Sequence, residues 1–115
     1  MLKFYYSLAP NPMKVALLLE EAALPYVAIP VDTRKGDQHA APLIALNPNA
    51  KVPVIVDGAT TVFDSSAILL YLAEKTGQFL PAPDGRGEML SWLLFTASGI
   101  GPFTGQRRIA PPAFD

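Results

Sequence analysis

The stretch Asn47-Pro48-Asn49-Ala50-Lys51-Val52-Pro53-Val54-Ile55-Val56-Asp57 leads from polar turn residues directly into a short strand rich in β-branched residues. Pro53 opens that strand and has no N–H to give to a ladder, so we expect Val52 and Pro53 at a sheet edge or a bend. The Val52–Pro53 bond is a candidate cis peptide, because cis bonds occur almost only before proline. An extended, kinked Val52 would leave its N–H and C=O free to pair with a peptide ligand. The alternative is an ordinary loop that enters a strand.

A second stretch follows, Val62-Phe63-Asp64-Ser65-Ser66-Ala67-Ile68-Leu69-Leu70-Tyr71-Leu72. It predicts the end of a strand and the start of an apolar helix that is capped by Asp64 or Ser65. The free N–H groups at a helix start, together with the helix dipole, form a site for an anion such as a carboxylate. The alternative is that Asp64 and Ser65 only cap the helix.

Together, residues 47–53 and 63–72 resemble the glutathione-binding half of cytosolic glutathione transferases, which has a thioredoxin-like fold. In that family, the residue before the cis-proline pairs its backbone with the cysteinyl part of glutathione. An acid–serine pair at the helix start holds the γ-glutamyl end. The resemblance assigns the first role to Val52, next to Pro53, and the second to Asp64 and Ser65. The family more often has Glu at the first position of the pair, so Asp64 is a shorter variant.

Length and composition limit the classes of protein and of functional site that are possible. The chain has 115 residues, of which 50% are hydrophobic, and a net charge of −1, which fits a globular domain and gives no basic stripe for nucleic acid. It has no cysteine, which excludes disulfides, thiolate metal sites and a CxxC redox couple within these residues. The lone histidine, His39, argues against a histidine metal cluster or a Ser-His-Asp triad, so no metal is expected.

Targeting signals are also not expected. Lys3 and polar turns interrupt any apolar run at the N-terminus. The longest apolar run, residues 67–73, is far shorter than the ~18 residues that a membrane span requires. We therefore expect a cytoplasmic location and no membrane partner.

The predicted element order is β-α-β-α-β-β-α, which matches the thioredoxin-like topology. We expect Asn11 to cap the first helix with Pro12 at its first position, Pro25 to end that helix, and Asp57-Gly58 to form a hairpin turn. Gly77 is the expected C-cap of the third helix. The predicted strands are residues 2–6, 26–31, 53–56 and 60–63, and the predicted helices are residues 13–24, 41–46 and 65–76.

Composition changes near residue 80, where Leu80-Pro81-Ala82-Pro83-Asp84-Gly85 is typical of a linker. Asp84 is the expected cap of a further helix that reaches about Gly99 and is apolar on nearly every side. The predicted organisation is a glutathione-binding domain at 1–79, a linker at 80–86, and the start of an all-helical domain at 87–115.

The resemblance extends to this region. Trp92-Leu93-Leu94-Phe95 with Gly101-Pro102-Phe103-Thr104-Gly105-Gln106 looks like the first helix of the family's second domain. The Gly-Pro-x-x-Gly-Gln pattern is similar to the nu class and its fungal prion-forming relatives. Further helices do not follow, and residues 107–115 depart from the pattern. We therefore interpret the chain as a truncated or fragmentary transferase.

We expect the turn at the start of the first helix to activate the glutathione thiol. A thiol of pKa ~8.5 becomes a thiolate near hydrogen-bond donors and a helix N-terminus. Asn11, Ser7, and the phenols of Tyr5 and Tyr6 are candidate donors here. Pro10-Asn11-Pro12-Met13-Lys14 resembles the nu-class motif, which favours Asn11, with Ser7 second. The alternative for Asn11 is a plain helix cap.

Two further residues, Gln38 and Lys51, match family positions that contact the glycyl end of glutathione. A lysine charge near a carboxylate is electrostatically favourable. The alternative is a solvated glutamine and lysine on the surface.

The resemblance implies a glutathione transferase that stabilises the glutathione thiolate and transfers it to an unknown electrophile, or that reduces disulfides with glutathione. The alternative is a non-catalytic glutathione-binding or interaction module. A glutaredoxin-like redox protein is disfavoured because the chain has no cysteine. The family forms dimers, and the apolar helix with Leu90, Trp92, Leu93, Leu94 and Phe95 needs a partner surface, so a homodimer is expected.

Overall fold

The computed structural model describes residues 1–96 of the 115. Of the elements in these described residues, the first compact unit, Met1–Gln78, holds the four strands and three α-helices, and a second unit begins at Phe79. The elements are β1 (Leu2–Tyr6), α1 (Pro10–Glu21), β2 (Tyr26–Pro30), η1 (Asp37–His39), α2 (Ala41–Leu46), β3 (Val54–Asp57), β4 (Thr60–Phe63), α3 (Ser65–Thr76), η2 (Pro83–Gly85) and α4 (Arg86–Phe95), where η denotes a 3-10 turn.

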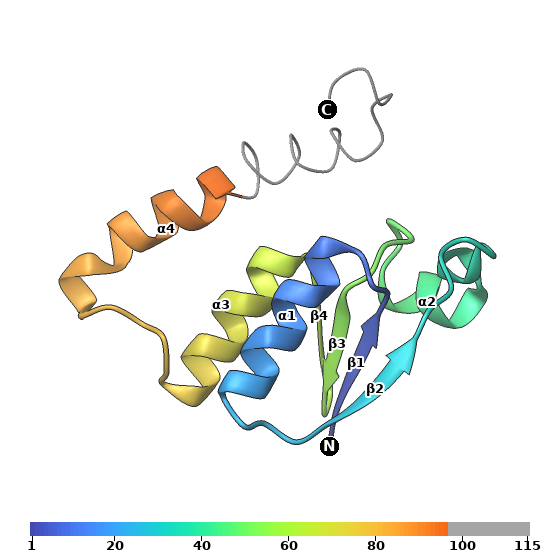
Figure 1. Cartoon of the computed structure of the whole chain (residues 1–115), viewed down its shortest axis with the longest axis horizontal. Coiled ribbons are helices and arrows are strands. Elements are labelled where there is room, and N and C mark those ends of the chain that lie inside the picture. The colour runs from blue at the N-terminus through green and yellow to red at the C-terminus, as the bar shows by residue number, and fades with distance from the viewer. Residues whose placement is uncertain (97–115) are drawn as a thin grey trace. The chain divides into compact units, whose positions relative to one another are not determined.

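The first unit is an α/β fold of the thioredoxin-like type, as predicted. Its sheet has the order β2-β1-β3-β4, with β1 parallel to β2 and antiparallel to β3, and β3 antiparallel to β4. Helices α1 and α3 cover one face of the sheet and α2 lies on the other (Figure 1). Because Pro30 cannot donate to a ladder, its position in the edge strand β2 agrees with the expectation from the sequence.

Alternating side chains of the strands supply two hydrophobic clusters, one on each face of the sheet. The larger cluster joins β1 and β3 to α1 and α3, and contains Leu2, Phe4, Val15, Leu19, Ile55, Ile68 and Leu72. The smaller cluster joins the opposite face to α2, and contains Val31, Leu43 and Val54, with Tyr5, Leu46 and Val52 packed against it. Val52, the residue expected to bind a ligand, is therefore anchored by its side chain in a core.

The start of α1 differs from the sequence prediction. The helix begins at Pro10 and its N-cap is Ala9, so Asn11 lies inside the first turn and makes no capping hydrogen bond. The fixed φ of Pro10 suits the first helical position. Pro12 is tolerated two residues later, because the first N–H groups of a helix have no partner within it. The prediction that Asn11 caps α1 is therefore wrong.

The end of α1 also comes earlier than predicted, at Glu21 instead of Leu24. Ala23 adopts a left-handed conformation with φ 54°, and the Leu24 N–H donates to the Leu19 C=O at 3.1 Å. This arrangement is a Schellman-type turn, in which the chain reverses and a hydrophobic residue packs back onto the helix. Leu24 packs against the larger cluster accordingly.

The other boundaries of the first unit follow the predictions closely. β1, α2, β4 and α3 have the predicted limits, whereas β2 ends one residue early and β3 runs from Val54 to Asp57. The shift of β3 has a simple reason, since Pro53 has no N–H for the ladder. Gly77 caps α3 in the left-handed conformation with φ 68°, as expected.

The second unit is described only to Thr96. Its helix α4 begins at Arg86 after a 3-10 turn that contains Asp84, and its N-cap is Gly85, without a side-chain cap. The prediction that Asp84 caps this helix is wrong. The aromatic rings of Trp92 and Phe95 meet edge to face at 5.8 Å. The predicted helix end near Gly99, the Gly-Pro-x-x-Gly-Gln pattern and the tail at 107–115 lie outside the described residues.

Candidate functional site

A cleft of about 360 Å³ opens in the first unit. Its lining comes from three places in the chain: the first turn of α1, the loop before β3, and the junction of β4 with α3. The lining residues are Asn11, Asn47, Asn49, Lys51, Val52, Pro53, Phe63, Asp64 and Ser65. Six of the eight residues proposed from the sequence therefore line one cleft, and Ser7 and Gln38 are not among its lining residues.

The loop before β3 forms one wall of the cleft. The Val52–Pro53 peptide bond is cis, the isomer considered from the sequence. Val52 is half-buried, packs against the smaller cluster and also lines the cleft. Within residues 1–96, no hydrogen bond is made by the N–H or the C=O of Val52. An extended ligand backbone can therefore pair with this residue.

The start of α3 forms the second wall. The Asp64 carboxylate accepts a hydrogen bond from the Ala67 N–H at 3.1 Å, so Asp64, rather than Ser65, is the helix cap. The N–H groups of Ser65 and Ser66 belong to the first turn and have no partner within the helix. With the helix dipole, these two groups favour an anion at this point of the cleft.

Asp64 adopts an unusual backbone conformation, with φ 77° and ψ 124°. A residue with a side chain rarely occupies this region, and such strain is concentrated at functional sites. The strained residue lies between β4 and α3, where the chain turns sharply from Phe63 into the helix. The turn brings Asp64 and Ser65 to the same cleft.

Asn11 contributes from the first turn of α1. Its side-chain oxygen accepts a hydrogen bond from the Lys14 ammonium at 3.1 Å. Because an ammonium only donates, this contact determines which end of the amide is the oxygen, and leaves the Nδ2 hydrogens for other acceptors. Asn11 lines the cleft, and its Nδ2 hydrogens are available to an acceptor, so its role in thiol activation stays a prediction.

Ser7 lies two residues before the N-cap of α1, and its hydroxyl oxygen accepts a long 3.4 Å hydrogen bond from the Ala9 N–H. Gln38 lies in η1, and its Oε1 is buried without a hydrogen-bond partner in the described part of the chain. Lys51, in contrast, lines the cleft and is exposed, so its charge is accessible to a ligand.

Sequence reasoning did not single out three lining residues: Asn47, Asn49 and Phe63. Asn47 is only 2% exposed, which is unusual for asparagine and marks a structural role. An asparagine before proline in a turn was the available signal, because Asx side chains bond to the backbone two residues on. Phe63 is 40% exposed and adds an aromatic surface at the end of β4.

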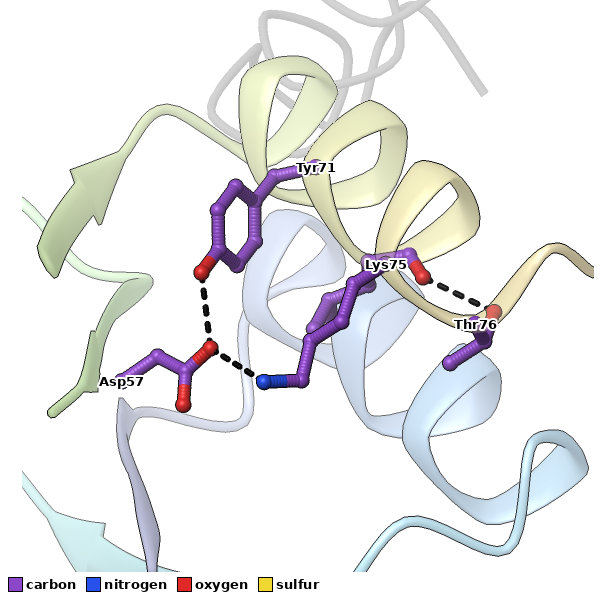
Figure 2. A network of polar contacts seen from close by, with 5 residues as sticks. Asp57, Tyr71, Lys75 and Thr76 are labelled. Carbon is purple, nitrogen blue, oxygen red and sulfur yellow. Dashed lines mark hydrogen bonds and ion pairs between the residues drawn. The ribbon is translucent and has the colours of Figure 1, made fainter.

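A second polar network, drawn in Figure 2, lies at the turn of the β3–β4 hairpin, which is the opposite end from the cleft residue Phe63. The Asp57 carboxylate accepts hydrogen bonds from the Lys75 ammonium at 2.6 Å and from the Tyr71 hydroxyl at 2.7 Å. The hydrogen bonds from Lys75 and Tyr71 lower the pKa of Asp57. The same contacts with the carboxylate raise the pKa values of Tyr71 and Lys75. This network ties the hairpin turn to the last two turns of α3.

Among residues 1–96, no group of three or more His, Asp or Glu side chains is arranged to hold a metal ion. No helix in the same part of the chain has the length and hydrophobicity to span a bilayer.

Residues 9–75 match the model of the glutathione S-transferase N-terminal domain. The chain belongs to the glutathione S-transferase family. The match includes all the lining residues of the cleft, so the cleft lies in the family's N-terminal domain.

Relatives in this transferase family include the disulfide-bond oxidoreductase YfcG of Escherichia coli K12, which is 43% identical over 114 residues covering 92% of this chain and 53% of that protein. A glutathione transferase from Pseudomonas putida, solved with one glutathione disulfide per subunit, superposes with a TM-score of 0.87 at 42% identity, over 91% of this chain and 49% of that one. Ure2p in complex with glutathione gives a TM-score of 0.85 at 30% identity, over 91% and 52%. The chain thus spans about half the length of these relatives.

Proposed function

We propose that this chain binds glutathione in the cleft and stabilises its thiolate for transfer to an electrophile or for reduction of a disulfide. The observation that supports this most is the convergence of three chemically different groups on one cleft. These are the unpaired backbone of Val52, the start of α3 at Ser65, and the amide of Asn11. Glutathione presents a peptide backbone, a carboxylate and a thiol, and so provides one partner for each.

The γ-glutamyl end of glutathione carries an α-carboxylate and an ammonium. We assign the carboxylate to the Ser65 hydroxyl and the N–H groups of the first turn of α3, because this position favours an anion. The ammonium pairs with the Asp64 carboxylate, which is exposed at the cleft. The glycyl carboxylate lies within the field of Lys51, with Gln38 as a second candidate partner.

The cysteinyl part pairs with the Val52 backbone, and the thiol lies near the start of α1. There, the Asn11 amide donates to the sulfur and favours the thiolate over the thiol. Ser7 remains the second candidate for this role. With a chlorinated aromatic substrate, the thiolate forms a C–S bond as the C–Cl bond breaks and chloride leaves.

Disulfide reduction would need no protein thiol. One glutathione thiolate attacks the disulfide and forms a mixed disulfide, and a second glutathione thiolate resolves it to glutathione disulfide. The substrate disulfide gains two electrons and leaves as two thiols. This route suits a chain without cysteine. The name of YfcG and the glutathione disulfide bound to the Pseudomonas putida relative agree with it.

We also propose that this chain forms a homodimer, as its resemblance to the family implies. Trp92, Leu94 and Phe95 of α4 are 61%, 59% and 50% exposed, an apolar surface of the kind found at interfaces.

The proposal is tested by calorimetry with glutathione and by turnover of 1-chloro-2,4-dinitrobenzene and of hydroxyethyl disulfide. In Asn11→Ala, the apparent pKa of bound glutathione, followed by thiolate absorbance against pH, should rise because the thiolate loses a donor. If that pKa does not change in Asn11→Ala but rises in Ser7→Ala, the activating residue is Ser7. Binding without turnover of either substrate would favour a glutathione-binding module, and absence of binding would contradict the proposed function.

A further inference from the structure

One buried residue organises the loop that carries Val52. The Asn47 side chain donates from Nδ2 to the Lys51 C=O at 3.0 Å. Its Oδ1 accepts from the Asn49 backbone N–H at 3.0 Å and from the Asn49 side-chain amide at 3.2 Å. Its own backbone C=O accepts from the Ala50 N–H at 3.0 Å. Asn47 thus forms hydrogen bonds with three of the next four residues, namely Asn49, Ala50 and Lys51.

The hydrogen bond from Asn47 to the Lys51 C=O also orients the Val52 N–H, because Lys51 and Val52 share a peptide group. This group is planar and trans, so its C=O and N–H point in opposite directions. The Lys51 C=O is turned toward Asn47, and the Val52 N–H is therefore turned away from it. Within residues 1–96 this N–H has no acceptor, and Val52 lines the cleft.

No other hydrogen bond in the described residues holds this peptide plane. The Lys51 C=O makes its bond to Asn47, and the β3 ladder begins only at Val54. Ala50 precedes this peptide plane and adopts a left-handed conformation with φ 56°. It lies outside the β3 ladder, so no strand pairing fixes its conformation. If the Nδ2 donor were removed, the plane could rotate, and a ligand would have to order it on binding.

We propose that Asn47 is a positioning residue that presents the Val52 N–H to the cysteinyl carbonyl of glutathione. It acts through the Lys51–Val52 peptide and not by contact with the ligand. This inference rests on the proposed binding of glutathione in the cleft. It adds a specific chemical expectation, namely that the effect of Asn47 depends on one carbonyl group of the ligand.

The test combines two variants with two ligands. Asn47→Asp keeps an acceptor for the Asn49 N–H but removes the donor to Lys51, and Asn47→Ala removes both. The ligands are glutathione and an analogue in which the cysteinyl–glycine C=O is reduced to CH₂. Tyr71→Phe is the control for a general loss of stability, because it weakens a network outside the cleft.

Both Asn47 variants should bind glutathione about three- to tenfold more weakly, the range for one hydrogen bond, whereas Tyr71→Phe should bind it as the wild type does. The wild type should bind the reduced analogue more weakly than it binds glutathione. For that analogue, the affinities of the Asn47 variants should be close to the affinity of the wild type. Equal losses for both ligands would mean general distortion of the cleft and would overturn the inference. Unchanged glutathione affinity in both variants would also overturn it, while leaving the proposed function intact.

A measurement on the wild type keeps the inference testable if the variants do not fold. The Val52 amide resonance should shift downfield when glutathione is added, and the shift should be much smaller with the reduced analogue. An unperturbed Val52 amide in the presence of bound glutathione would contradict the inference. If the wild type binds neither ligand, the proposed function and this inference both fail.

Discussion

The two ends of the β3–β4 hairpin treat their polar groups differently. At the turn end, the Asp57 carboxylate is paired with both Lys75 and Tyr71. At the cleft end, the N–H groups of Val52, Ser65 and Ser66 have no partner within the described residues, whereas the Ala67 N–H donates to the Asp64 cap. Both ends of this hairpin lie next to α3: the cleft end leads into its first turn, and the turn end bonds to its last two turns. The comparison shows that one fold can pair its polar groups at one end of a hairpin and leave them available to a ligand at the other.

The largest effect that distinguishes the two ends is expected for ligand binding. Ser65→Ala should lose about 1–3 kcal/mol of glutathione binding, because a charged group of the ligand loses a hydrogen bond. Its thermal stability should change little, since Asp64 and not Ser65 caps α3. Calorimetry with glutathione and thermal unfolding measure the two quantities. Tyr71→Phe at the turn end is the matched control, and a similar loss of affinity in both variants would break the comparison.

A smaller effect is expected at the turn end, where it should appear as stability. Asp57→Asn should cost on the order of 1 kcal/mol at neutral pH, because the network is partly exposed and screened by solvent. Glutathione affinity should not change.

The pH dependence of that stability has a definite sign. The pKa of Asp57 is lowered in the folded state, so its stabilisation is complete above its unfolded pKa of about 4 and is lost as the pH falls further. The raised pKa values of Tyr71 and Lys75 mean that their contributions are present below about pH 10 and are lost as the pH rises beyond it. Urea unfolding from pH 2.5 to 7 should show a shallower decline on acidification for Asp57→Asn than for the wild type. Equal slopes would exclude this network as the cause.

The smallest effect concerns the backbone of the cleft loop. Ala50→Gly relieves the cost of a left-handed conformation, roughly 1 kcal/mol, but increases the entropy of the unfolded chain by a similar amount. The net change in the free energy of unfolding should stay within a few tenths of a kcal/mol. Glutathione affinity should also be retained, because the bond from Asn47 to Lys51 remains. Chemical denaturation and calorimetry measure both, and a large loss of affinity would show that Ala50 itself holds the loop.

Most of the first unit could be predicted from sequence because its signals are local. Aromatic and β-branched residues indicated the strands, and Asp57-Gly58 indicated the hairpin turn that the structure contains. The cleft loop and the start of α3 were recognised from a proline at a strand start and a cap before an apolar run. These are the features from which Val52 and Ser65 were proposed, and both line the cleft.

What could not be predicted depends on contacts between side chains and a folded backbone. The structural role of Asn47 arises because a left-handed Ala50 brings the Lys51 C=O back to the Asn47 amide. The start of α1 was misjudged because two prolines near Asn11 both fit the first turn of a helix. The Asp57 network joins residues 14 and 18 positions apart, and only the folded hairpin brings them together.

The strand register determines how the length of the β3–β4 hairpin can vary between proteins. Val54 pairs with Phe63 at the cleft end of the hairpin, and Asp57 pairs with Thr60 at the turn. An insertion of matched residue pairs at the turn would lengthen both strands equally and leave the Val54–Phe63 pair where it is. The two walls of the cleft would then keep their spacing while the far end of the hairpin changed. Homologues can thus differ in the length of this hairpin and share the same binding chemistry, provided that a new anchor replaces the bonds to Asp57.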